Sequence, residues 1–143
     1  MSDGIRFEPG STVYLDTNPI IYLTEANPVF KKAITALFKA LETAGARLMT
    51  SELTLSEVLV HPLRQNDAKL IARYERLFDT LVDARPVSRE VLLLTAQLRA
   101  EYSSLKTPDA IRVATATLAE ADVFVSADAG IRGLPESMRL VAL

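Results

Sequence analysis

The chain has 143 residues, of which 49% are hydrophobic and 24% charged, and its formal net charge is −2. This composition is typical of one globular domain with a substantial core. There is no cysteine and only one histidine, His61, which excludes disulfides, thiolate nucleophiles, zinc–thiolate sites and multi-histidine metal sites. No apolar run approaches the roughly 20 residues of a membrane span, and the N-terminus lacks the basic-then-apolar pattern of a signal peptide. We therefore expect a soluble, cytoplasmic protein.

Short apolar runs alternate with helical patterns after residues 1–11, which we expect to form a loose lead-in. The expected strands cover residues 12–15, 47–50, 84–87, 123–126 and 139–143. The expected helices cover residues 19–25, 28–44, 54–61, 66–80, 89–102 and 107–119. This alternation predicts one domain over residues 1–143, a three-layer α/β/α sandwich around a mostly parallel sheet.

Several residues mark expected helix ends. Asn18 precedes a proline and is suited to an N-cap, and Gly45 is placed to end the second helix. Thr54 and Glu57 have the spacing of a capping box. Pro62 is expected to stop the helix that this box opens.

Four carboxylates occupy positions that suggest one site. Asp16 and Asp128 follow predicted strands, whose carboxyl ends lie at one edge of a parallel sheet. Glu57 and Asp109 fall in the first turn of predicted helices. Because burying unpaired negative charge is costly, such a cluster suits a hard cation with all-oxygen ligands, Mg²⁺ or Mn²⁺. The pattern favours metal-assisted phosphodiester chemistry.

Each of these acids also has an ordinary structural explanation. Asp16 could cap the next helix through an Asx-turn, and Glu57 could complete its capping box. Asp109 could complement a helix dipole, and Asp128 could be a turn residue. The functional interpretation rests on the four acids occurring together in order.

Four segments carry a family resemblance: VYLDTNPIIYL, SELTLSEVL, TPDAIRVATA and FVSADAGI. In this order and spacing they resemble the PIN-domain ribonucleases, especially the VapC-type toxins of bacteria and archaea. The resemblance implies an α/β/α fold, metal-dependent cleavage of RNA, and the role of toxin in a type II toxin–antitoxin pair.

The resemblance also implies roles for individual residues. Asp16, Asp109 and Asp128 would hold Mg²⁺ or Mn²⁺, and Glu57 would complete the catalytic set as an outer ligand or an orienter of water. The supporting polar residues would be Ser126, which hydrogen-bonds within the site, and Asn18, which is equally suited to its N-cap role.

Two positions depart from the common pattern of the family. Ala127 stands where many relatives have Asn, and Arg112 where many have His. Neither change removes a carboxylate, but they affect the geometry of the fourth acid and the mode of substrate contact. We take Arg112 as a candidate RNA contact.

A basic stripe is a second candidate RNA contact. Lys69, Arg73 and Arg76 recur at helical spacing on one face, where they could bind phosphates. A solvated face explains the same residues somewhat better, because Asp67 and Glu75 interrupt the stripe.

Apolar helix faces are candidate partner surfaces. They could form a homodimer interface or dock an antitoxin segment, although core packing better explains most of these side chains. They comprise Ile20, Ile21 and Leu23 in one helix, and Val29, Phe30, Leu37 and Phe38 in the next.

Two other functions remain open. A Mg²⁺-dependent phosphatase or phosphotransferase could use clustered aspartates, but Asp16 is followed by Thr17 and Asn18, which does not match the DxDxT nucleophile motif of haloacid-dehalogenase-like phosphatases. The chain could also be a catalytically silent RNA-binding or interaction module on the same scaffold. The four acids argue against that module, and Ala127 keeps it open.

Overall fold

One parallel sheet forms the centre of the computed structural model, which describes residues 5–143. Its strands are β1 (Thr12–Leu15), β2 (Arg47–Ser51), β3 (Asp83–Arg85), β4 (Val123–Ser126) and β5 (Arg139–Ala142). They lie in the order β3-β2-β1-β4-β5, and every neighbouring pair is parallel. β1 is therefore the central strand, so the residue that follows it lies in the middle of one sheet edge.

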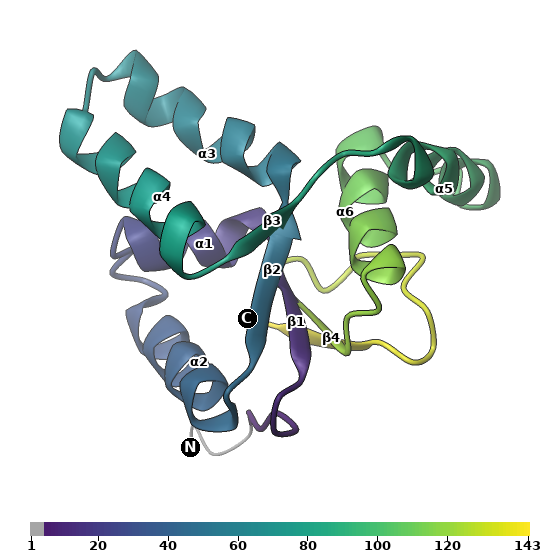
Figure 1. Cartoon of the computed structure of the whole chain (residues 1–143), viewed down its shortest axis with the longest axis horizontal. Coiled ribbons are helices and arrows are strands. Elements are labelled where there is room, and N and C mark those ends of the chain that lie inside the picture. The colour runs from purple at the N-terminus through teal and green to yellow at the C-terminus, as the bar shows by residue number, and fades with distance from the viewer. Residues whose placement is uncertain (1–4) are drawn as a thin grey trace.

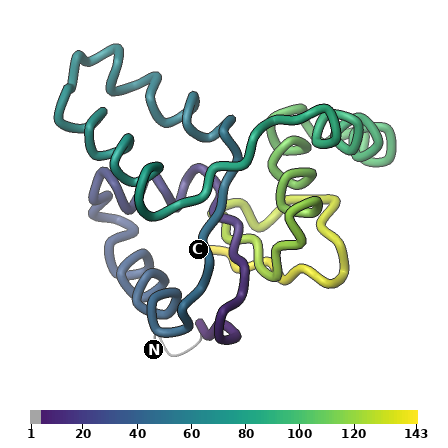
Figure 2. The backbone as a smooth tube through the Cα atoms, viewed as in Figure 1, coloured from purple at the N-terminus to yellow at the C-terminus, as the bar shows by residue number. Residues whose placement is uncertain are grey.

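Helices cover both faces of this sheet, which confirms the expected α/β/α fold. They are α1 (Thr17–Thr24), α2 (Lys31–Ala44), α3 (Glu52–Arg64), α4 (Ala68–Thr80), α5 (Arg89–Glu101) and α6 (Thr107–Leu118). Helices α1 to α4 lie on one side and α5 and α6 on the other (Figure 1). The backbone trace shows α3 and α4 running side by side as an arm that extends away from the sheet (Figure 2).

The strand residues alternate between two apolar cores. Val13 and Leu15 pack into the core shared with α1, α2 and α4. Tyr14 and Phe124 face the opposite side, where their rings stack with centroids 4.8 Å apart. Both faces are buried because right-handed crossovers place helices on each side of a parallel sheet. This explains why β1 and β4, which lie inside the sheet, are mostly apolar.

Two expected helix starts are wrong. Helix α1 begins at Thr17 with Asp16 as its N-cap, and Asn18 is exposed in the first turn. Helix α3 begins at Glu52, and the Ser51 hydroxyl caps it by accepting a bond of 3.1 Å from the next-but-one N–H. Each capping residue lies at the end of a strand in extended backbone, so its side-chain oxygen already reaches the first N–H groups. Thr54 and Glu57 lie inside α3, where they are free to make tertiary contacts.

Other helix boundaries differ by a few residues. Helix α3 continues through Pro62 to Arg64, because a proline in the last turn removes only one hydrogen bond. Helix α2 begins at Lys31, so Val29 precedes it and is 82% exposed rather than buried. Gly45 ends α2 as expected, with φ of 60° in the left-handed region.

The N-terminal lead-in is more ordered than expected within the described residues. Residues 1–4 lie outside them. Phe7 is buried in the core, and the Gly10 N–H donates to the Ala44 carbonyl at 2.8 Å. Residues 5–11 therefore pack against the fold rather than forming a loose segment. In the described part of the chain, no helix combines the length and apolarity needed to cross a membrane.

Tyr74 ties α4 to the end of α1. Its side chain is buried, and its hydroxyl donates a hydrogen bond to the Glu25 carboxylate. Arg73 adds a bond of 3.3 Å to the Thr24 carbonyl. Burial, followed by the hydrogen bond and the charge of Glu25, raises the pKa of Tyr74 above its ordinary value. The arm formed by α3 and α4 is thereby fixed to α1, the helix that Asp16 caps.

Tyr74→Phe is expected to lower the free energy of unfolding by about 1–2 kcal/mol at pH 7, because the half-buried Glu25 carboxylate loses its donor. Folding raises the pKa of Tyr74. The neutral hydroxyl therefore contributes its full stabilisation below the pKa of tyrosine in the unfolded chain, near 10, and this contribution is lost as the pH rises further. The difference between the two proteins should therefore shrink at pH 11. Urea unfolding at both pH values measures this, with Tyr22→Phe, a half-buried position on α1, as control. A constant difference would contradict the assigned role.

Candidate active site

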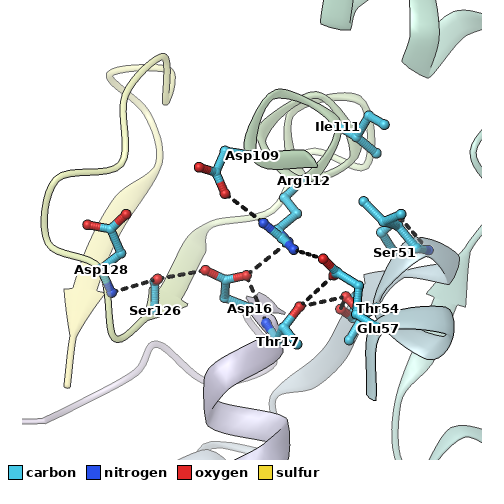
Figure 3. A network of polar contacts seen from close by, with 12 residues as sticks. Asp16, Thr17, Ser51, Thr54, Glu57, Asp109, Ile111, Arg112, Ser126 and Asp128 are labelled. Carbon is cyan, nitrogen blue, oxygen red and sulfur yellow. Dashed lines mark hydrogen bonds and ion pairs between the residues drawn. The ribbon is translucent and has the colours of Figure 1, made fainter. Parts of the chain in front are cut away.

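Three of the four predicted carboxylates converge on the guanidinium of Arg112 (Figure 3). Arg112 Nε lies 3.2 Å from Asp16 Oδ1, and Nη1 lies 2.6 Å from Asp109 Oδ1. Nη2 donates to Glu57 Oε2. A planar guanidinium presents several donors in fixed directions, so one side chain can pair with carboxylates from three elements.

The elements explain how these side chains meet. Asp16 ends the central strand, and Glu57 lies in the second turn of α3 rather than in the first turn as expected. Asp109 and Arg112 are three residues apart on α6, which places them on one helix face. Asp109 lies in the first turn of its helix as predicted.

The centre of the cluster is buried and its rim is accessible. The side chains of Arg112 and Asp16 are 10% and 9% exposed, whereas those of Glu57 and Asp109 are 30% and 36% exposed. Burial, the largest single influence, lowers the pKa of Arg112, but the Glu57 hydrogen bond and the charges of Asp16 and Glu57 together raise it above the ordinary value. Arg112 thus stays protonated, and the three carboxylates still outnumber it.

Asp16 is the most constrained of the acids. Its Oδ1 accepts the Thr17 N–H at 2.8 Å, and its Oδ2 accepts the Ser126 hydroxyl at 2.7 Å. Ser126 Oγ in turn accepts the Asp128 N–H at 2.9 Å. Ser126 therefore connects the end of β1 to the turn after β4.

Asp128 lies at the rim of the cluster rather than at its centre. It is exposed, and its Oδ1 accepts the Gly130 N–H at 2.8 Å, which closes its own turn. Its backbone is tied to Asp16 only through Ser126. Asp128 therefore acts as a turn residue and also lies beside the other acids.

A row of threonine hydroxyls supports Glu57, and the sequence analysis did not predict this row. Thr17 Oγ1 donates to Glu57 Oε1 at 3.0 Å and lies 3.4 Å from Thr54 Oγ1. Thr54 and Thr50 hydroxyls are 3.0 Å apart, and both side chains are buried. The one available signal was the spacing of Thr54 and Glu57, which also places two residues on one helix face.

The remaining predicted residues lie elsewhere. Arg112 was expected to contact RNA, but its guanidinium is buried among carboxylates that occupy its donors, so this arrangement does not offer it to a substrate. Asn18 is exposed on α1. Lys69, Arg73 and Arg76 are exposed on α4, a helix that carries none of the four acids.

The donor chemistry of the cluster suits a hard divalent cation, because the carboxylates supply only oxygen and an excess of negative charge. The arrangement is different: across residues 5–143, no three side chains of His, Cys, Asp or Glu are grouped so that they could hold one ion. The guanidinium of Arg112 lies between the acids and compensates their charge. The residues fit a metal in kind and charge, but not in their present spacing.

The sequence model of the PIN domain matches residues 13–136. This range includes all four acids, and the chain belongs to the PIN-domain family. No protein among the curated sequences matches the chain.

Three solved structures share the fold. VapBC2 from Rickettsia felis, bound to a DNA fragment from its promoter, is 15% identical with a TM-score of 0.73, over 92% of this chain and 98% of the other. A toxin–antitoxin complex from Klebsiella pneumoniae is 26% identical with a TM-score of 0.62, over 89% and 98%. FitAcB from Neisseria gonorrhoeae is 18% identical with a TM-score of 0.63, over 82% and 88%.

Proposed function

We propose that the chain is a metal-dependent endoribonuclease that hydrolyses RNA phosphodiester bonds, and that it acts in the cytoplasm as the toxin of a type II toxin–antitoxin pair. The observation that supports this most is the convergence of Asp16, Glu57 and Asp109, from three separate elements, at one edge of a PIN-domain sheet. Residues that only capped their own helices would have no reason to meet.

The proposed roles follow from the contacts of each acid. Asp16, Asp109 and Asp128 would hold Mg²⁺ or Mn²⁺, which would supply Lewis acidity and a water of lowered pKa. The Asp16 side chain is only 9% exposed, and its oxygens accept from Thr17 and Ser126, so it is suited to be a fixed, buried ligand.

Glu57 is better placed than Asp16 to take a proton. Its side chain is 30% exposed, and the Thr17 hydroxyl orients one of its oxygens. The other oxygen, Oε2, faces Arg112 and the centre of the cluster. We therefore assign Glu57 the role of positioning the attacking water and accepting its proton.

Cleavage of a mixed RNA pool is expected with Mg²⁺ or Mn²⁺ and not with EDTA. Asp109→Asn should slow cleavage by at least about a hundredfold, as expected when a residue acting on the transition state is removed. Asp79→Asn, an exposed position on α4, is the matched control. Cleavage that persists in EDTA would contradict metal dependence.

One alternative keeps support from the site itself. Because Arg112 compensates the acids and no metal-ready group of three is present in residues 5–143, the chain could be a catalytically silent RNA-binding or interaction module. A folded protein that binds RNA but gives no turnover with either ion would favour this module over the enzyme.

The basic stripe on α4 remains a proposed RNA contact. The slope of the logarithm of the RNA association constant against the logarithm of the salt concentration measures the number of phosphate contacts. Replacing Lys69, Arg73 and Arg76 by Gln should reduce this slope by up to about 2, at roughly 0.7 for each contact with a single strand. Filter binding between 50 and 200 mM salt, with the RNA used for cleavage, measures this slope. An unchanged slope would assign the stripe to an ordinary solvated face.

Partners are proposed from the neighbours and from the surface. The Rickettsia and Klebsiella structures are VapBC and toxin–antitoxin complexes, which supports an antitoxin partner for this chain. Of the predicted apolar faces, Ile20 and Leu37 are buried in the core, so they are not available. Val60 and Leu63 on α3 are 45% and 57% exposed, and we propose this face for a homodimer or the antitoxin; the mass of the isolated chain in solution tests the dimer.

A further inference from the structure

Arg112 occupies the position that a bound cation would need. Its three nitrogens face oxygens of Asp16, Asp109 and Glu57, and its side chain is nine-tenths buried (Figure 3). Two of these acids, Asp16 and Asp109, are among the proposed metal ligands. A guanidinium and a divalent ion would therefore require the same carboxylate oxygens.

We propose that Arg112 is a built-in competitor of the divalent ion, so that the ion binds only when the guanidinium leaves Asp16 and Asp109. This inference rests on the proposed metal-dependent function. Two cations sharing these buried oxygens would repel strongly, because charges interact more strongly away from water. The affinity for the ion is thus set partly by the strength of the Arg112 pairs.

The weakest of the three pairs shows where the competition begins. Arg112 Nε is buried and, among the described residues, has no hydrogen-bond acceptor in good geometry, although Asp16 Oδ1 is 3.2 Å away. A buried donor without a hydrogen bond is unfavourable. The link to Asp16, the most fixed carboxylate, is therefore the one that an entering ion replaces most easily.

The three carboxylates differ in their freedom to follow the guanidinium. Asp16 is held by Thr17 and Ser126, whereas Glu57 is 30% exposed and lies on a different element. In the proposed displacement, the Arg112 guanidinium stays paired with Glu57 and moves away from Asp16 at the end of β1. Asp16 and Asp109 would then face each other across the vacated position.

The test is Mn²⁺ binding without RNA, measured by isothermal titration calorimetry. Arg112→Gln is expected to bind Mn²⁺ more tightly than the unmodified chain by roughly 5- to 150-fold, the usual range of coupling between two binding events. Arg76→Gln is the matched control, since it removes the same charge from the exposed face of α4. A purely structural role for Arg112 would give the opposite result, because disordered acids bind an ion less well.

Equal or weaker binding by Arg112→Gln would overturn the proposal, and so would the absence of binding in both proteins. If the variant does not fold, the unmodified chain gives the answer through the Arg112 Nε–H signal in a ¹⁵N NMR titration with Mg²⁺. If the chemical shift of this signal moves to that of a solvent-exposed guanidinium, the displacement is supported. An unchanged chemical shift at saturating Mg²⁺ overturns the proposal. Because no RNA is present, a chain that shows the competition but cleaves nothing would keep this inference and lose the ribonuclease.

Discussion

Asp16→Asn is expected to reduce RNA cleavage by at least about a thousandfold, because Asp16 is the buried centre of the proposed metal site and an amide oxygen is a weaker, neutral ligand. Asp16 directly follows the central strand β1 and faces Arg112, Ser126 and the first N–H of α1. Among residues 5–143, no other acid contacts both Ser126 at the end of β4 and Arg112 on α6.

The same substitution is expected to leave the fold intact. Asn is as good an N-cap as Asp, so the Thr17 N–H keeps an acceptor. Its amide can also donate to Ser126 Oγ. Removing one of three neighbouring carboxylates relieves their mutual repulsion, so the free energy of unfolding should change by less than about 1 kcal/mol. Cleavage rates and urea unfolding measured together separate lost chemistry from lost structure, with Asp79→Asn as control; full activity in a folded Asp16→Asn protein would remove the assigned site.

Arg112→Gln is expected to destabilise the metal-free protein by about 2–3 kcal/mol. Breaking a fully buried ion pair typically costs about 3–5 kcal/mol, and the value here is smaller because Glu57 and Asp109 are 30% and 36% exposed. The cost arises because Asp16, which is 9% exposed, keeps its charge but loses its cation. For a chain of this size the Tm should fall by roughly 6–10 °C.

Thermal unfolding in EDTA measures this effect, and Arg76→Gln controls for the change in net charge. Added Mn²⁺ should restore much of the lost stability, because an ion that binds only the folded state stabilises it by an amount that rises with the logarithm of its concentration over Kd. An Arg112→Gln protein as stable as its parent in EDTA would show that the guanidinium does not hold the acids together.

Local patterns predicted the architecture well because they report local physics. Strand runs such as 12–15 and 123–126 are mostly apolar, as buried parallel strands require. Gly45 ends its helix as expected, since caps depend on residues only a few positions apart. The prediction failed at Asn18 and Thr54, where a neighbouring strand end supplied a better-placed cap.

The candidate site was likewise predictable only in part. The sequence by itself determined that four acids follow strands or lie on helices in the order of the PIN-domain family. Only the tertiary structure decided that Arg112, at a position first interpreted as an RNA contact, pairs with three of these acids, while Asp128 stays at the rim. The physical reason is distance along the chain: Asp16, Glu57 and Arg112 are too far apart for periodicity to relate them, and the strand order with β1 at the centre brings them together.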